Sequence, residues 1–174
     1  MEARHYAAED VLRDGAPVWI RALQPEDRER LAQFHGRLSP ESVYMRYFEY
    51  KPVLSPRDLG YLTELDYDRR VALVAALSPE STAPIVGVAR YDVLPGAPGR
   101  PVRAELGIIV EDTFQNRGIG TVLLKHLLGV AHDHGIAEIT AEVLPQNTRM
   151  LELVAGAGVP VRRELEEGVI HLTV

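Results

Sequence analysis

The segment from Gln115 to Thr121, Gln-Asn-Arg-Gly-Ile-Gly-Thr, has the composition of an anion-binding turn. It lies between an apolar stretch that ends at Val110 and the longest amphipathic pattern in the chain. The first turn of a helix carries backbone N–H groups without internal partners and a partial positive charge, so it attracts phosphate. Gly118 and Gly120 lack a Cβ that would hold a phosphate away from the backbone, and Arg117 adds a charged donor. The sequence therefore predicts a phosphate cradle at this turn.

Two common phosphate motifs do not fit this turn. The Gly-Lys-Ser/Thr ending of a P-loop is missing, and Leu123 stands where the GxGxxG pattern needs its last glycine. The turn instead resembles the Gln/Arg-x-x-Gly-x-Gly/Ala signature of the Gcn5-related N-acetyltransferases, the GNAT family. The resemblance implies acetyl-coenzyme A (acetyl-CoA) as the cosubstrate. Its pyrophosphate would be held by Gln115, Asn116, Arg117, Gly118, Ile119, Gly120, Thr121 and Val122.

The same resemblance implies roles for residues on both sides of the cradle. The preceding strand would pair with the pantetheine arm of the coenzyme as an added strand would, through Ile108, Ile109 and Val110. Asn147 stands where the family has an asparagine that contacts the coenzyme arm at the start of the next helix. A short polar residue at a helix start also fits a plain N-cap, and Asn147 can fill both roles.

The chain departs from most small-molecule members of the family in its general acid. Those members carry a tyrosine that protonates the departing thiolate, whereas this chain has Val154 at that place. The stretch 37–48 resembles the early helices of bacterial protein lysine acetyltransferases of the Pat type, which also lack the tyrosine. Those enzymes rely on a glutamate in the strand before the cradle, and Glu105 occupies that position. The resemblance therefore implies Glu105 as general base and a protein lysine as acceptor.

Acetyl transfer to lysine needs such a base. A lysine with a pKa of about 10.4 is neutral only about once in 2,500 at pH 7, so deprotonation costs roughly 4.6 kcal/mol. A carboxylate, directly or through one water, would accept the proton and attract the cation. A backbone N–H near Ile108 or Ile109 would then polarise the thioester carbonyl. A strand glutamate can instead pair with an arginine, and Arg90 and Arg103 are the candidates.

Three functions are compatible with these residues. The favoured one is direct transfer of acetyl from acetyl-CoA to a protein lysine, and the Pat resemblance makes an acyl-CoA synthetase a candidate partner. The acceptor could instead be a small amine such as a polyamine, an aminoglycoside or an amino acid. The chain could also be a non-catalytic acyl-CoA sensor. The sequence leaves open the acyl chain and whether the protein is a monomer or a homodimer.

Three further groups of residues could do chemistry, but each has a simpler interpretation. The histidines of the long helix lack the i, i+4 spacing of a helical metal pair, so no metal is expected at His126, His132 and His134. Four aromatic residues are expected to pack in the core rather than line an acceptor groove: Tyr44, Tyr47, Phe48 and Tyr50. Four acids are expected to be exposed loop charges rather than an acceptor rim: Asp66, Asp68, Glu111 and Asp112.

The elements that must position these residues follow from periodicity and from turn residues. Strands are expected at 18–23, 70–77, 85–93, 102–110, 136–144, 159–164 and 168–174. Helices are expected at 25–38, 40–48, 56–63, 118–134 and 146–155. This mixed order predicts an α/β fold, and the resemblance implies the GNAT type, a mixed and mostly antiparallel sheet flanked by helices.

Length and composition place the chain in a familiar class. A length of 174 residues, with 46% hydrophobic and 25% charged residues, predicts one globular domain at 17–174 after a lightly ordered leader at 1–16. A net charge of −6 without a basic cluster argues against a nucleic-acid partner, and the absence of cysteine excludes thiol chemistry. The longest apolar stretch, 71–77, is too short to span a membrane, and the start resembles no secretory signal, so the cytoplasm is expected.

Overall fold

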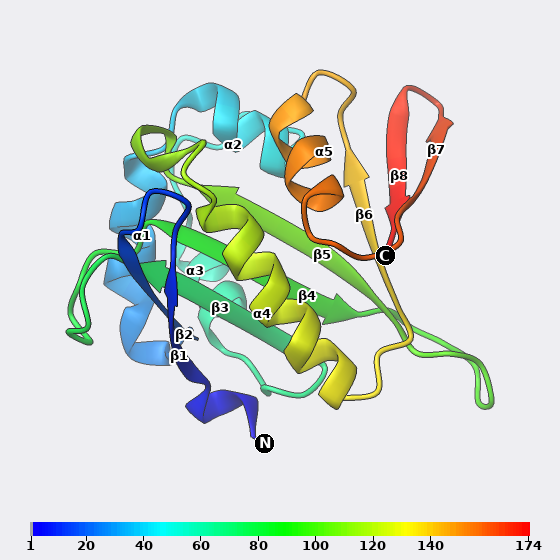
Figure 1. The fold of residues 1–174 in the computed structure, drawn as a ribbon, viewed down its shortest axis with the longest axis horizontal. Helices are drawn as coiled ribbons and strands as arrows, with labels where there is room; N and C mark the ends of the chain where they lie inside the picture. Colours follow the sequence, from blue (N-terminus) through cyan, green and yellow to red (C-terminus); the bar gives the residue numbers. More distant parts are fainter. Residues whose placement is uncertain (1) are drawn as a thin grey trace.

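A computed structural model describes residues 2–174 and shows one eight-stranded sheet, in the order β1-β2-β3-β4-β5-β6-β8-β7 (Figure 1). The strands are β1 (Ala7–Val11), β2 (Pro17–Ala22), β3 (Arg70–Ala76), β4 (Gly87–Val93), β5 (Arg103–Val110), β6 (Glu138–Val143), β7 (Arg162–Glu166) and β8 (Val169–Thr173). Strands β1 to β5 form an antiparallel meander, β5 and β6 are parallel, and β6, β8 and β7 are again antiparallel. The predicted mixed and mostly antiparallel sheet is confirmed.

Residues at the helix starts explain where the helices begin. The α-helices are α1 (Arg28–Gly36), α2 (Pro40–Tyr47), α3 (Pro56–Thr63), α4 (Ile119–Asp133) and α5 (Thr148–Ala155), with 3-10 turns η1 (Ala3–His5), η2 (Pro25–Asp27) and η3 (Asp112–Phe114). Ser39 caps α2 by accepting from the Ser42 backbone N–H at 3.1 Å. Ser55 and Asp58 form a reciprocal capping box at α3. Both helices have proline in the first turn, where its missing N–H costs nothing.

Helices cover both faces of the sheet. Neighbouring residues of a strand point to opposite faces, and β4 shows this directly. Arg90 donates to the Leu62 carbonyl of α3, whereas the Tyr91 hydroxyl lies 2.9 Å from His134 Nδ1, just past α4. Helices α3 and α4 therefore lie on opposite faces, with β3 buried between them along Val71–Ala76. No helix within residues 2–174 has the length and apolar character to cross a bilayer.

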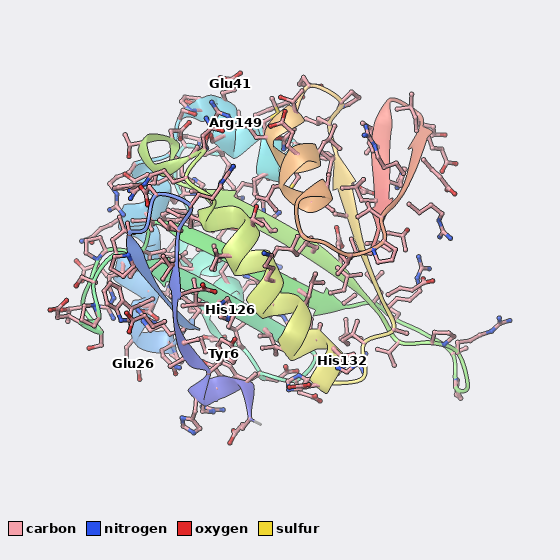
Figure 2. All side chains as sticks on the ribbon, in the orientation of Figure 1. Tyr6, Glu26, Glu41, His126, His132 and Arg149 are labelled. Carbon is pink, nitrogen blue, oxygen red and sulfur yellow. The ribbon has the colours of Figure 1, made fainter. Side chains whose placement is uncertain are left out.

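The N-terminal segment differs from the predicted leader. Residues 7–11 form strand β1, which pairs with β2 along its whole length. Tyr6 and Asp10 also hold this segment to α4, because the Tyr6 hydroxyl lies 2.5 Å from His126 Nδ1 and Asp10 lies 2.8 Å from His126 Nε2. Figure 2 shows Tyr6 beside His126 of α4. The sequence does not predict this strand, because its side chains are mostly small or polar. Backbone pairing with β2 and the polar contacts with His126 hold it in place.

A buried carboxylate fixes the junction between β2 and α1. Asp27 is 1% exposed and accepts hydrogen bonds from Arg21 at 2.6 and 2.8 Å and from Arg30 at 2.9 Å. Burial acts to raise the pKa of Asp27, but the hydrogen bonds from Arg21 and from the Gln24 backbone outweigh it, so this pKa is lowered. The carboxylate therefore stabilises the fold in its charged form.

Asp27→Asn is expected to lower the free energy of unfolding at pH 7 by about 3 kcal/mol, because it leaves two arginines without their shared carboxylate. Since the folded pKa lies below the unfolded value, Asp27 contributes fully above about pH 4, and its contribution is lost as the pH falls towards the folded pKa. Urea unfolding at pH 7 and at pH 3 checks this, with the exposed neighbour Glu26→Gln as control. Equal losses at both pH values would contradict it.

Candidate active site

A cleft of about 720 Å³ opens where β5 and β6 separate. The two strands pair only at Arg103–Glu138, Ala104–Ile139 and Glu105–Thr140. Beyond this point they diverge towards the end of the molecule where α5 lies (Figure 1). The edge of β5 at residues 106–110 therefore lines the cleft and has no strand partner on that side within the described chain. An extended ligand could pair with this edge as an added strand would, which is the role expected of Ile108, Ile109 and Val110.

The predicted cradle forms one wall of the cleft. Asn116 and Gly118 adopt left-handed backbone conformations, with φ of 63° and 89°. Gly118 is the N-cap of α4 and makes no side-chain cap, and its carbonyl accepts the first α-helical bond from the Val122 N–H at 3.0 Å. The preceding N–H groups of the first turn thus have no partner inside the helix. They can donate to an anion in the cleft.

The structure brings most of the predicted binding residues together. The cleft is lined by Ile108, Ile109, Val110, Gln115, Asn116, Gly118, Ile119, Gly120, Thr121, Val122 and Asn147. Arg117 is not among the lining residues, because its guanidinium turns to Asp14 at 3.2 Å. Asn147 caps α5 by accepting from the Met150 N–H at 3.2 Å, so its expected role as a cap is confirmed.

Gly120 has a different packing role from the one expected. A Cβ at this position would collide with the side chain of Leu153 on α5 and would come within 3.5 Å of Val110 Cγ2. The missing side chain therefore lets α5 pack closely against the start of α4. The two helices that border the cleft are held together at this contact.

Sequence reasoning missed several cations of the cleft, of which Arg13 is the most informative. Arg13 lies in the turn between β1 and β2, and its Nε would be 3.2 Å from a Cβ on Gly118. Lys125 and Arg149 line the cleft as well. Figure 2 shows Arg149 and Glu41 at the same end of the molecule, and both line the cleft. Arg13 could have been found only by recognising that residues 7–22 form a hairpin.

Asp112 ties the cradle to α2. It accepts hydrogen bonds from the Ser39 backbone at 2.9 Å, the Ser39 hydroxyl at 2.7 Å and the Ser42 hydroxyl at 2.8 Å. Burial acts to raise the pKa of Asp112, but the hydrogen bonds from Ser39 and Ser42 outweigh it and lower this pKa. The expectation of exposed loop charge is therefore wrong for Asp112. It is also wrong for Glu111, which is 8% exposed and pairs with Arg37 at 3.2 Å.

Glu105 lies in a second hollow of about 260 Å³ on the face covered by α2 and α3. Its side chain is exposed, and in the sheet it stands opposite Asp92 of β4. The arginines considered as its partners are engaged elsewhere, Arg90 with Asp92 at 3.3 Å and Arg103 with Glu138 at 3.1 Å. Glu105 is therefore not held in an ion pair with either of them.

The two hollows meet on β5. Arg46, Leu106 and Gly107 line both the cleft and the hollow of Glu105. A ligand that runs along the free edge of β5 and a second molecule beside Glu105 would thus approach each other at Gly107. We call the second space the acceptor hollow, defined by Arg46, Tyr47, Lys51, Leu54, Asp58, Tyr61, Leu62, Arg90, Asp92, Glu105, Leu106 and Gly107.

The aromatic residues of the α2 region divide between two roles. Tyr47 lines the acceptor hollow, whereas Tyr44 and Tyr50 are 46% and 78% exposed. The expectation that all four pack in the core is wrong, because Tyr44 and Tyr50 are exposed and neither Tyr47 nor Phe48 belongs to the hydrophobic core. Val154, which replaces the usual tyrosine, is 1% exposed and belongs to the core.

Comparison with known proteins identifies the class of this fold and site. The profile of the acetyltransferase (GNAT) family matches residues 39–158. An acetyltransferase of Pseudomonas aeruginosa is 31% identical over 173 residues, which cover 98% of this chain and 90% of that protein. The chain therefore belongs to the GNAT acetyltransferase family. Its activity is the acetyl-CoA-dependent N-acetyl transfer of that family.

Two further relatives are of the Pat kind. The GNAT domain of S. lividans PAT is 35% identical, with a TM-score of 0.86, and the match covers 97% of this chain and 96% of that domain. Acetyltransferase Pat of Mycolicibacterium smegmatis is 31% identical over 156 residues, or 88% of this chain. This chain spans 45% of the length of that relative. The resemblance to Pat-type enzymes is confirmed for the domain.

Gly118→Ala is expected to lower the free energy of unfolding by about 1 kcal/mol or more, because alanine is strained at a φ of 89°. Gly129→Ala is the matched control in the same helix, where an added Cβ meets nothing within 4 Å. That control is expected to gain about 0.5–1 kcal/mol from helix propensity. Urea unfolding of both variants measures the contrast, and equal effects would contradict the assigned conformation at Gly118.

Proposed function

We propose that the protein transfers the acetyl group of acetyl-CoA to the ε-amine of a protein lysine, with Glu105 as general base. The observation that carries this proposal is the junction of the cleft and the acceptor hollow at Gly107, with Glu105 on the acceptor side. The similarity to Pat-type enzymes supports this choice, because the resemblance to them implies a protein lysine as acceptor. An acyl-CoA synthetase is a candidate for the acetylated partner.

The cleft suits acetyl-CoA at two points. The open first turn of α4 offers backbone donors to the pyrophosphate, and Arg13 stands beside them. The free edge of β5 offers backbone groups of Ile108, Ile109 and Val110 to the amide-containing pantetheine arm. Acetyl-CoA supplies a thioester carbonyl carbon for the acceptor to attack.

Glu105 and the β5 backbone would divide the chemistry between them. Glu105 takes a proton from the acceptor ammonium, directly or through one water, and its charge attracts that cation. The amine nitrogen then forms a bond to the carbonyl carbon, and the thiolate leaves with the electron pair of the C–S bond. The second proton lost by the nitrogen passes to this thiolate, directly or through water. A backbone N–H near Ile108 or Ile109 stabilises the charge that develops on the carbonyl oxygen. No covalent enzyme intermediate is needed.

A small amine is the second candidate acceptor. The acceptor hollow of about 260 Å³ could hold a whole small molecule as well as a lysine side chain. Incubation with acetyl-CoA, protein acceptors and a panel of free amines separates the two, with acetylated sites read by mass spectrometry. Modification of free amines alone would overturn the lysine assignment. Absence of transfer to every acceptor would favour an acyl-CoA sensor.

Glu105→Gln is expected to lower kcat/KM by about 10²–10⁴-fold, because the base is removed while the cleft is unchanged. Acetyl-CoA affinity by calorimetry should stay at the wild-type value. Glu138→Gln is the control, since Glu138 lies on the neighbouring strand and lines neither hollow. Wild-type turnover in Glu105→Gln would remove this residue from catalysis.

Arg13→Gln is expected to weaken acetyl-CoA binding by about tenfold, the loss of one charge-assisted hydrogen bond. The affinity of this variant should also depend less steeply on salt. Arg117→Gln is expected to change binding much less, because Asp14 already partners Arg117. Calorimetry at two salt concentrations tests both variants. A larger loss in Arg117→Gln than in Arg13→Gln would show that Arg117 leaves Asp14 for the coenzyme.

A further inference from the structure

Arg90 is an unusual residue for the centre of a sheet. It lies on β4, is 4% exposed, and its Nη2 is buried without a hydrogen-bond partner among the described residues. Its other contacts are long, 3.3 Å from Nε to Asp92 and 3.5 Å from Nη1 to the Leu62 carbonyl. A buried guanidinium with a free donor costs stability unless a ligand or a water accepts that hydrogen bond.

Asp92 does not neutralise Arg90 fully, because it is shared. Arg70 Nε also donates to Asp92, at 2.9 Å, which is a shorter contact than that of Arg90. Burial lowers the pKa of Arg90, Asp92 opposes this shift, and charge repulsion from Arg46 adds to it. The positive charge at the floor of the acceptor hollow therefore exceeds what its nearest carboxylate balances.

Arg46 approaches the same point from α2. Gly107 stands opposite Arg90 in the sheet, and a Cβ on Gly107 would collide with the Arg46 guanidinium, whose Nε would lie 2.8 Å away. Within residues 2–174, Arg46 makes no side-chain hydrogen bond or ion pair. Its guanidinium lies 4.9 Å from the centre of the Tyr47 ring. Two arginines with free donors thus face one glycine, and that glycine is where the cleft meets the acceptor hollow.

We propose that Arg46 and Arg90 form a carboxylate-binding subsite of the acceptor hollow, so that the enzyme prefers amines that carry a carboxylate near the reacting nitrogen. This inference rests on the proposed transfer to an amine beside Glu105. Glu105 and Gly107 are two residues apart on β5, about 7 Å along the strand. An acceptor whose amine hydrogen-bonds to Glu105 and whose carboxylate hydrogen-bonds to the arginines bridges this distance, because each of the two hydrogen bonds adds about 3 Å to the length of the ligand. A free amino acid can do so, and so can a lysine beside an acidic residue in a protein.

Matched acceptors test the subsite and separate the two sources of the carboxylate. One pair is leucine and leucinamide, and the other is two lysine peptides that differ only in Asp or Asn beside the lysine. The ratio of kcat/KM for acid over amide is measured for wild type, Arg90→Met and Arg46→Gln. Arg69→Gln is the control, because Arg69 is an exposed arginine outside both hollows.

In at least one acceptor pair, the acid-over-amide ratio of kcat/KM is expected to be about 10- to 100-fold higher for wild type than for Arg90→Met or Arg46→Gln. The reason is that each variant loses hydrogen bonds from a charged donor to the carboxylate. The pair that shows the effect identifies the source of the carboxylate. Arg70 stays with Asp92 in Arg90→Met, so no buried carboxylate is left alone. If that variant still fails to fold, Arg46→Gln decides the question.

Two results would overturn the subsite. An unchanged ratio with wild-type kcat/KM for every acceptor would mean that an internal water alone serves Arg90, for which a bordering cavity of about 20 Å³ has room. An unchanged ratio with the same loss of kcat/KM for acid and amide acceptors would assign the arginines a structural role. Failure of the wild type to acetylate any acceptor would contradict the proposed function itself, which is a separate outcome.

Discussion

The short parallel ladder between β5 and β6 is the constraint on which the site depends. Three residue pairs hold the strands together, and beyond these pairs the two strands diverge. The sheet is continuous on both sides of this point, because β5 is paired with β4 and β6 with β8. The fold can therefore leave backbone groups of β5 unpaired without losing the strand. Those groups are the ones that an extended ligand would use.

The helix α2 connects the two halves of the site. Its N-terminal end is held by Asp112, and Ser42 also lies 3.3 Å from the Gln115 amide nitrogen. Further along the same helix, Arg46 reaches Gly107. A helix of eight residues thus contacts the cradle at one end and the acceptor hollow near the other. The spacing between the two ligand sites is set by this rigid element rather than by a loop.

The elements with strong apolar periodicity could be predicted from the sequence. The observed limits of α3 are the predicted ones, residues 56 and 63. Gly135 follows α4 with a φ of 74°, as expected of a glycine that ends a helix. The start of α4 could also be predicted, because it depends on the left-handed conformation of a local glycine, Gly118. Strand β1 could not be predicted in this way, since its stability comes from pairing with β2 and from contacts with His126.

Side-chain partners far apart in sequence were the other limit of prediction. The sequence around Glu111 and Asp112 does not show that Glu111 pairs with Arg37 or that Asp112 accepts a hydrogen bond from Ser39. These partners come together only when α2 packs against the sheet. For the same reason the sequence could not show that Arg117, which is predicted to bind the pyrophosphate, forms an ion pair with Asp14. Glu105 was located correctly on β5 and Arg90 was named as a candidate partner, but the sequence could not show that Arg90 pairs with Asp92 or that Arg46 reaches Gly107.

The turn between β1 and β2 brings Arg13 to the cleft, which is also lined by Asn147, the N-cap of α5. The cleft is thus assembled from segments near both ends of the sequence, and it exists only when the whole sheet has formed. Contacts between residues so far apart in sequence slow folding, because closing long loops costs entropy before the contacts form. A compound that fills the cleft consequently binds the native state alone and shifts the unfolding equilibrium of the entire domain by mass action.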